Sequence, residues 1–114
     1  MFKFARPSKN FLALVDCSDA SFAETSKFPA KVGGDDDCAL KIDGADFEFE
    51  VSPSKTGVLE AKVAQRGDFL VNGVEPGEGF ELGGVATLQI GERLFYLISD
   101  REAFERAKRM DVSR

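Results

Sequence analysis

Residues 46–51, DFEFEV, decide the fold class, because apolar and acidic residues alternate there without exception. Successive side chains of a β-strand point to opposite faces, so the two phenylalanines and the valine share one face and the three acids share the other. A strand with this pattern places one face in a core and leaves a strongly negative face in water. The segment therefore predicts a half-buried strand.

The same alternation continues on both sides of this segment. Residues 38–42, 58–65 and 85–90 each place apolar side chains at every second position. Further strands are expected at residues 11–15, 28–32, 69–71, 80–82 and 93–99. Many short strands separated by turn signals are typical of a β-sandwich or barrel, so we predict an all-β fold.

Two glycine-containing pairs mark tight turns. Asn72 and Gly73 both tolerate a positive φ and lie between two apolar stretches. We interpret the glycine-rich stretch around them, GDFLVNGVEPGEGFELGG (residues 67–84), as a chain reversal rather than a loop that holds a ligand. Gly91 and Glu92 form a two-residue loop with glycine first, which predicts a type II′ hairpin between the strands at 85–90 and 93–99.

The pattern changes to that of a helix near the end of the chain. Ser99 followed by Glu102 matches a capping box, and Phe104 shares one helical face with Ala103, Ala107 and Met110. We expect this helix to pack Phe104 on the β-sandwich. Open alternatives are that this basic helix mediates self-association or leads into a partner or a further domain.

The charge and the residue content exclude several classes of function. The net charge is −5, and residues 35–81 hold 12 Asp or Glu against four Lys or Arg. Nucleic-acid binding requires the opposite sign. The chain has no His, so the commonest general base and His-ligated metal sites are missing. We therefore expect no enzyme activity, no catalytic residues, no metal and no cofactor.

The cysteine content and the N-terminal stretch indicate the compartment. Cys17 and Cys38 are too few for a disulfide scaffold, so two reduced thiols are favoured over one bridge. The first residues lack the long apolar run of a signal peptide, and no segment approaches a membrane span. We expect a soluble, cytoplasmic protein without membrane insertion.

Three stretches resemble the forkhead-associated (FHA) family. They are FPAKVGG at 28–34, DCALKIDGADFEFEV at 37–51, and FLVNGVEPGEGFELGGVATLQIGERLFYL at 69–97. The resemblance implies an FHA-like β-sandwich of roughly 8–11 short strands with one C-terminal helix. Residues 1–98 would form the sandwich, with the resemblance strongest over 28–97, and residues 99–114 the helix and tail. Family members bind phosphothreonine peptides.

The residues that hold the phosphate in the family are replaced in this chain. Gly34 stands where the family has an arginine, and Ala45 where it has a serine. In the same alignment Asp46 replaces a further arginine and Glu48 a histidine. The family's peptide-binding asparagine falls among residues 65–67, which contain none. The resemblance therefore implies an FHA-like domain with a degenerate phosphothreonine site.

The candidate partner-binding loops follow from position in this motif. Asn72 is retained, although the family uses that residue largely to shape a turn. Acidic residues predominate in the other loops, and like charges would repel a phosphate that carries about −1.5 to −2. The candidate residues are Gly34, Asp35, Asp36, Asp37, Ala45, Asp46, Glu48, Arg66 and Asn72.

Three hypotheses of function remain open. The first is a non-catalytic protein–protein interaction module whose acidic loops bind a basic peptide or surface. The second is a phosphopeptide-binding FHA domain with a rearranged pocket that uses Lys31, Lys41 or Arg66. The third is a structural domain of a larger assembly, such as a secretion-system ring.

Overall fold

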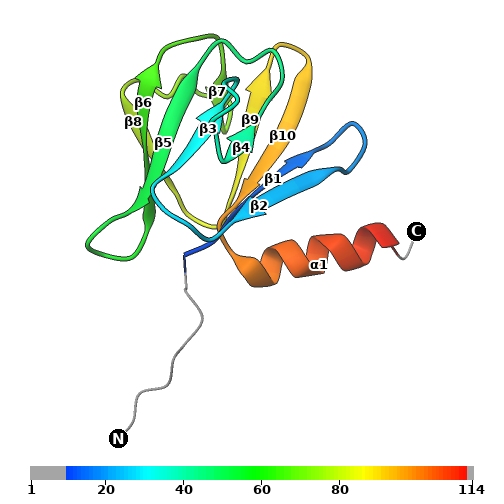
Figure 1. The fold of residues 1–114 in the computed structure, drawn as a ribbon. Coiled ribbons are helices and arrows are strands. Elements are labelled where there is room, and N and C mark those ends of the chain that lie inside the picture. Colours follow the sequence, from blue (N-terminus) through cyan, green and yellow to red (C-terminus); the bar gives the residue numbers. More distant parts are fainter. Residues whose placement is uncertain (1–9, 113–114) are drawn as a thin grey trace, which may run out of the picture.

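The computed structural model describes residues 10–112, which form a β-sandwich followed by one helix (Figure 1). One five-stranded sheet has the order β2-β1-β10-β9-β7 and the other the order β4-β3-β5-β6-β8. The all-β prediction is confirmed. The elements are β1 Leu12–Asp16, β2 Phe22–Thr25, β3 Ala30–Gly33, β4 Leu40–Lys41, β5 Glu48–Pro53, β6 Leu59–Gln65, β7 Leu70–Val71, β8 Gly79–Leu82, β9 Val85–Ile90, β10 Arg93–Ile98 and α1 Arg101–Val112.

The core lies between the two sheets and is built on the alternating segment. Phe47, Phe49 and Val51 are buried in the core cluster, whereas Glu50 is exposed to solvent. The Phe47 ring stacks on Phe69 at a centroid distance of 4.0 Å, which ties the residue before β5 to the stretch that precedes β7. Aromatic pairs of this kind add to the stabilisation that burial provides. The predicted strand periodicity is therefore confirmed here.

Two strands differ from the predicted ones. β2 was not expected, because its sequence FAET does not place apolar residues consistently on one side. It forms because it pairs along its length with β1 at the edge of the sheet. β4 is only two residues long, where five were expected, and it runs parallel to β3. Cys38 and Ile42 are buried beside β4 although they lie outside it.

Both predicted turns are present. Asn72 and Gly73 have φ values of 53° and 81°, and Val71 and Val74 exchange two backbone hydrogen bonds across them. The Asn72 side-chain oxygen also accepts a hydrogen bond from the Thr87 backbone N–H at 2.9 Å. Gly91 has a φ of 61°, and the residues on either side of the Gly91–Glu92 loop pair in register. The glycine-rich stretch thus reverses the chain, as predicted.

The capping box predicted for the helix is wrong. Asp100 is the cap, since its side-chain oxygen accepts the Glu102 N–H at 3.0 Å. Ser99 instead accepts a hydrogen bond from the Gly84 N–H at 3.0 Å, because the end of β10 lies beside the turn before β9. Phe104 packs on Phe11, as expected from its helical face. No helix within residues 10–112 is both long and apolar enough to cross a membrane.

Candidate partner-binding loops

Three loops lie together at one end of the sandwich, opposite the end where α1 is attached (Figure 1). They comprise residues 34–39, 42–47 and 66–69, and we call them the loop end. The loops approach closely at two glycines. A Cβ on Gly34 would lie 2.4 Å from the Ala45 backbone oxygen, and one on Gly67 would lie 2.3 Å from an Asp46 side-chain oxygen. Larger residues would therefore push the loops apart.

Asp46 joins two of the loops through hydrogen bonds. Its backbone oxygen accepts a bond from the Gln65 side-chain amide at 3.0 Å, and its side-chain oxygen accepts the Asp68 N–H at 3.2 Å. Each bond links residues about twenty positions apart in the chain. Asp46 therefore acts as an acceptor that positions the 66–69 loop against the 42–47 loop.

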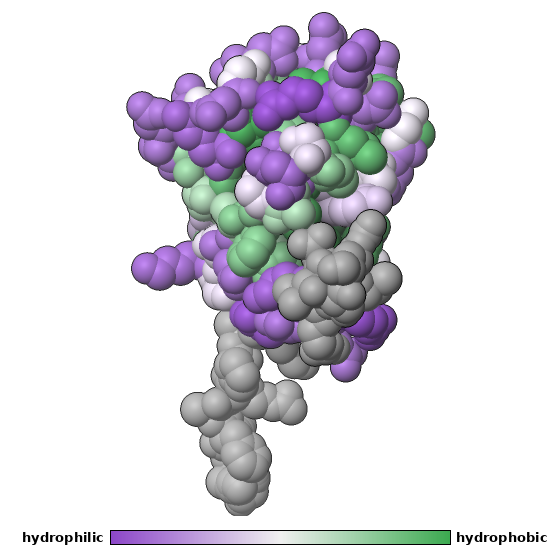
Figure 2. Space-filling view, turned by 90° about the vertical axis from the view of Figure 1, so that its right-hand side faces the viewer, coloured by the Kyte–Doolittle hydropathy of each residue, from purple (hydrophilic) through white to green (hydrophobic). Residues whose placement is uncertain are grey.

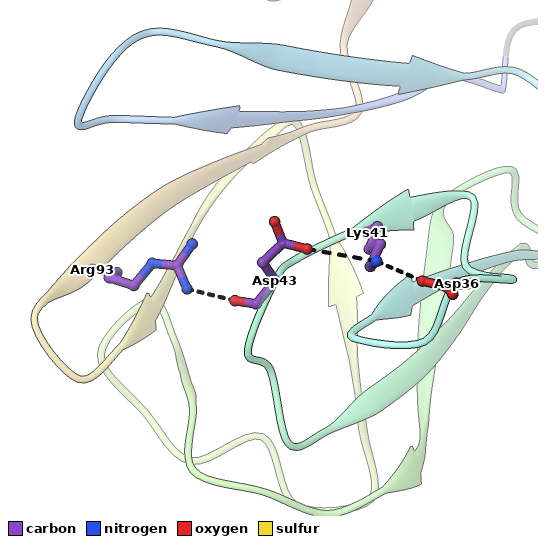
Figure 3. Close-up of polar contacts among 4 residues, drawn as sticks. All are labelled: Asp36, Lys41, Asp43 and Arg93. Carbon is purple, nitrogen blue, oxygen red and sulfur yellow. Dashed lines mark hydrogen bonds and ion pairs between the residues drawn. The ribbon is translucent and has the colours of Figure 1, made fainter.

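The lysines near these loops are already paired with aspartates. Lys41 Nζ lies 2.5 Å from an Asp36 oxygen and 3.6 Å from an Asp43 oxygen (Figure 3). Lys31 Nζ lies 3.2 Å from an Asp37 oxygen. The hydrogen bonds to Asp36 and Asp37 raise the pKa of Lys41 and Lys31 respectively, and the bond from Lys41 lowers the pKa of the Asp36 carboxyl. Both lysine charges are thus balanced within the protein.

Arg93 connects the loop end to the other sheet. Its guanidinium donates a hydrogen bond to the Asp43 backbone oxygen at 2.8 Å (Figure 3) and lies 5.0 Å from the centre of the Phe95 ring. No local pattern indicates this contact, because the two residues are 50 positions apart. Arg93 is a loop-positioning residue that sequence reasoning missed.

Cys38 lies between two carboxylates. Its sulfur is 4.0 Å from a Glu48 oxygen, and one ligand atom each of Asp37, Cys38 and Glu48 lie within 4.8 Å of one another. Burial chiefly, and then the neighbouring carboxylates, raise the pKa of the Cys38 thiol. The thiol is therefore disfavoured as a thiolate in the absence of a bound cation. Cys17 and Cys38 are both free thiols.

A groove of about 360 Å³ opens beside the 66–69 loop. Arg66 lines it and makes no ion pair among the described residues. The groove therefore holds one guanidinium outside any such ion pair, together with the carboxylates of Asp68 and Glu75 and several apolar side chains. Its lining consists of Val63, Arg66, Gly67, Asp68, Phe69, Leu70, Glu75, Pro76, Gly77, Gln89 and Gly91.

Eight of the nine candidate residues lie at the loop end or in the strand that leaves it; Asn72 does not. Leu70 pairs with Gln89 and Val71 with Leu88, so β7 runs away from the turn at Gly91. Asn72 continues in that direction to meet Thr87, where its side chain holds the turn. The eight that converge are Gly34, Asp35, Asp36, Asp37, Ala45, Asp46, Glu48 and Arg66.

Comparisons with known proteins identify the fold. The sequence matches no protein-family model and no curated protein. The structure is similar to Mycobacterium tuberculosis EmbR in complex with a low-affinity phosphopeptide, with a TM-score of 0.62, 10% identity and 79% of this chain covered. It is similar to the FHA domain of an Arabidopsis thaliana hypothetical protein, with a TM-score of 0.59, 16% identity and 88% covered. A third similar structure is Rad53 1–466 in complex with AMP-PNP, with a TM-score of 0.64, 10% identity and 97% covered.

The lengths of these proteins differ. This chain spans 24% of the EmbR chain and 35% of the Rad53 chain, but 94% of the Arabidopsis domain. At these identities the comparisons establish the fold alone. The two-sheet sandwich is FHA-like, which confirms the family resemblance of the sequence at the level of fold.

Proposed function

We propose that this FHA-like sandwich is a non-catalytic protein–protein interaction module whose loop end binds a basic, unphosphorylated segment of a partner. The observation that carries the proposal is the pairing of Lys31 and Lys41 with aspartates of the same loops. These are two of the three cations from which a rearranged phosphate pocket could be built. An anion would have to break those pairs to use them, whereas a basic segment can join the existing carboxylates.

The electrostatic balance of the loop end supports the same partner. Asp35, Asp36, Asp37, Asp43 and Asp46 are all exposed there. Among the described residues, Asp35 and Asp46 form no ion pair, so negative charge remains after the lysines are counted. Opposite charges steer association and fix its register, and salt screens them. Binding of a basic segment is therefore expected to weaken as ionic strength rises.

The backbone at the loop end also disfavours phosphate binding. Gly34 occupies the position where the family resemblance implies an arginine, and the Ala45 carbonyl fills the space that a Cβ at Gly34 would need. A long basic side chain at this position requires the 34–39 and 42–47 loops to separate. The missing arginine is thus part of the loop packing rather than an isolated change.

The absence of catalysis and the cytoplasmic location belong to the same proposal. The loop end offers carboxylates, paired lysines and small residues, and the chain has no His. The one thiol there, Cys38, is buried beside Glu48, and burial raises its pKa, which disfavours the nucleophilic thiolate. Incubation with ATP and with model ester and peptide substrates tests the first part, and turnover would contradict it. Cell fractionation tests the second.

The experiment is a fluorescence anisotropy titration with labelled peptides. An unphosphorylated Lys/Arg-rich peptide should bind more tightly in low salt than in high salt, and phosphothreonine peptides should not bind. The triple variant D36N/D37N/D43N should bind the basic peptide with about tenfold lower affinity, since three carboxylates are neutralised. The control E50Q/E60Q/E81Q removes the same charge from β5, β6 and β8, and should retain binding. Equal losses in both variants would refute the site.

A second candidate function rests on Arg66, which lines the 360 Å³ groove and pairs with no carboxylate among the residues that the structure describes. Phosphopeptide binding could use this guanidinium, since arginine forms strong charge-assisted hydrogen bonds to phosphate. A phosphothreonine peptide library tests it directly. Saturable binding that the R66A variant abolishes would establish this function in place of the first, and failure of the whole library would remove it.

A further inference from the structure

The outer face of the sheet β2-β1-β10-β9-β7 is only partly covered by α1. Ala13 and Ile98 lie opposite each other on this face and are buried with Phe11 and Phe104. The next residues along the same face, Val15 and Tyr96, also lie opposite each other, but Tyr96 is 39% exposed. An apolar area therefore continues beyond the helix contact, and Figure 2 shows apolar surface on this side of the molecule.

This uncovered area forms a groove of about 470 Å³. Phe22, from the edge strand β2, is 48% exposed there and meets the Phe104 ring edge-on at 5.1 Å. Lys108 Nζ lies 5.2 Å and 4.9 Å from the centres of these two rings. A preformed apolar concavity of this size is typical of binding sites. Its lining is Val15, Asp16, Cys17, Ala20, Phe22, Leu94, Tyr96, Ile98, Phe104, Ala107 and Lys108.

Acidic residues surround the end of the groove that lies away from the helix. Asp16 lines the groove and also an adjoining hollow that contains Glu92 and Arg93, and the Arg93 guanidinium is already hydrogen-bonded to the Asp43 backbone oxygen. Asp19 lies in the exposed turn between β1 and β2. Apolar surface with this acidic border suits a segment that alternates apolar and basic side chains, because such a segment satisfies both surfaces at once.

We propose that the N-terminal segment of this chain, residues 1–9 (MFKFARPSK), binds in this groove. The segment carries Phe2 and Phe4 two positions apart, so both rings would share one side of the segment if it bound in an extended conformation. Its basic residues, Lys3, Arg6 and Lys9, carry the charge opposite to that of the acidic border. In this position the two phenylalanines would fill the apolar groove, and the basic residues would complement the charge of Asp16, Asp19 and Glu92.

The chain enters the sandwich at the right place for this contact. Phe11 is buried and its ring lies 5.4 Å from that of Phe104, which lines the groove. β1 has five residues and spans about 17 Å, whereas nine extended residues reach about 30 Å. Residues 1–9 are therefore long enough to turn back along β1. The groove is separate from the loop end, so failure of this proposal leaves the proposed function untouched.

Cys17 provides a built-in reporter for the test. It lines the groove and is exposed, whereas Cys38 is buried under the loop end and serves as an internal reference. The rate of Cys17 alkylation by iodoacetamide is measured by mass spectrometry on the full chain at mildly alkaline pH. In the F2S/F4S variant Cys17 should react several-fold faster than in the parent protein, and fluorescence of the apolar probe anilinonaphthalene sulfonate should rise. The control A5S/S8A should behave as the parent.

Two further arms make the assignment specific. A synthetic MFKFARPSK peptide added to the F2S/F4S protein should slow Cys17 alkylation again. When F22S is combined with F2S/F4S, the peptide should no longer slow Cys17 alkylation. When V58S, on the distant β5–β6 connection, is combined with F2S/F4S instead, the peptide should still slow it. Unchanged Cys17 and probe signals in F2S/F4S would overturn the proposal. Light scattering that shows a concentration-dependent dimer, lost in F2S/F4S, would also overturn it, because the segment would then bind a neighbouring copy.

Discussion

The loop end and the outer face of the β1-containing sheet are built from opposite chemistry. The loop end exposes five aspartates and balances its lysines internally, whereas the outer face exposes Phe22, Leu94 and Tyr96 beside a helix. Polar contacts between exposed groups contribute little to stability, whereas buried rings contribute much. We therefore expect the exposed charges of the loop end to influence partner choice more than stability, and the buried rings beside α1 to influence stability.

The largest expected effect is on the helix-bearing side. Phe104 is 1% exposed and contacts Phe11 and Phe22. F104A should lower the free energy of unfolding by about 3–5 kcal/mol, measured by urea denaturation, because the ring leaves a cavity between α1 and the sheet. Ala107 is exposed on the same helix, so A107S is a matched control that should change little. A loss below about 1 kcal/mol in F104A would mean that α1 is not packed as described.

The next effect tests the packing of the loop end itself. G34R should destabilise the protein by about 1–3 kcal/mol, because a Cβ at this position meets the Ala45 carbonyl at 2.4 Å. It should not create phosphopeptide binding. G83A is the control, since nothing lies within 4 Å of the Cβ position there and it should leave unfolding unchanged. Phosphothreonine peptide binding restored by G34R alone would contradict the account of the loops.

A smaller effect is expected at Asp46, where two substitutions distinguish the role of its hydrogen bond from the role of its charge. D46A removes the acceptor of the Asp68 N–H and should cost about 1 kcal/mol in urea denaturation. D46N keeps an acceptor oxygen while it removes the charge, so it should stay close to the parent protein. If the two variants were equally destabilised, the carboxylate charge rather than the hydrogen bond would hold the loop.

The smallest expected effect is the pH dependence of the lysine–aspartate pairs. The pKa of Asp36 is lowered in the folded protein. Its contribution to the free energy of unfolding is therefore present above the unfolded pKa near 3.8 and is lost as the pH falls through the folded pKa. The pKa values of Lys31 and Lys41 are raised, so their contribution is present below 10.5 and is lost as the pH rises through the folded values. Stability should therefore be insensitive to these pairs between about pH 5 and 9.

NMR titration of the Asp36 carboxyl carbon checks this directly. The parent protein should show an Asp36 midpoint below 3.8, and K41M should return it toward that value. An Asp36 midpoint that does not respond to K41M would show that the pair in Figure 3 does not form in solution.

The sequence predicted those features that depend on neighbouring residues. The alternation at 46–51 fixed which side chains enter the core, and Asn72–Gly73 specified its own turn because both residues accept positive φ. β2 was missed because its formation depends on pairing with β1 rather than on its own pattern. The helix cap was misassigned because Ser99 has a partner, Gly84, from another part of the chain.

The candidate loops followed from the family resemblance, but their internal contacts did not. The pairing of Lys41 with Asp36 and Asp43, and the bond from Arg93 to the Asp43 backbone, join residues from loops and strands that only the folded chain brings together. The groove beside α1 likewise requires the outer faces of three strands and one face of the helix. Contacts of this kind carry no local signal in the sequence.

Two-dimensional ¹H–¹⁵N NMR with unlabelled peptides tests the central claim most directly. An unphosphorylated basic peptide should shift the amides of residues 34–37 and 43–46 in a saturable, salt-sensitive way, and a phosphothreonine peptide should leave them unchanged. Saturable shifts of these amides by the phosphothreonine peptide, with none from the basic peptide, would show that the loop end binds phosphate and would contradict the proposed function.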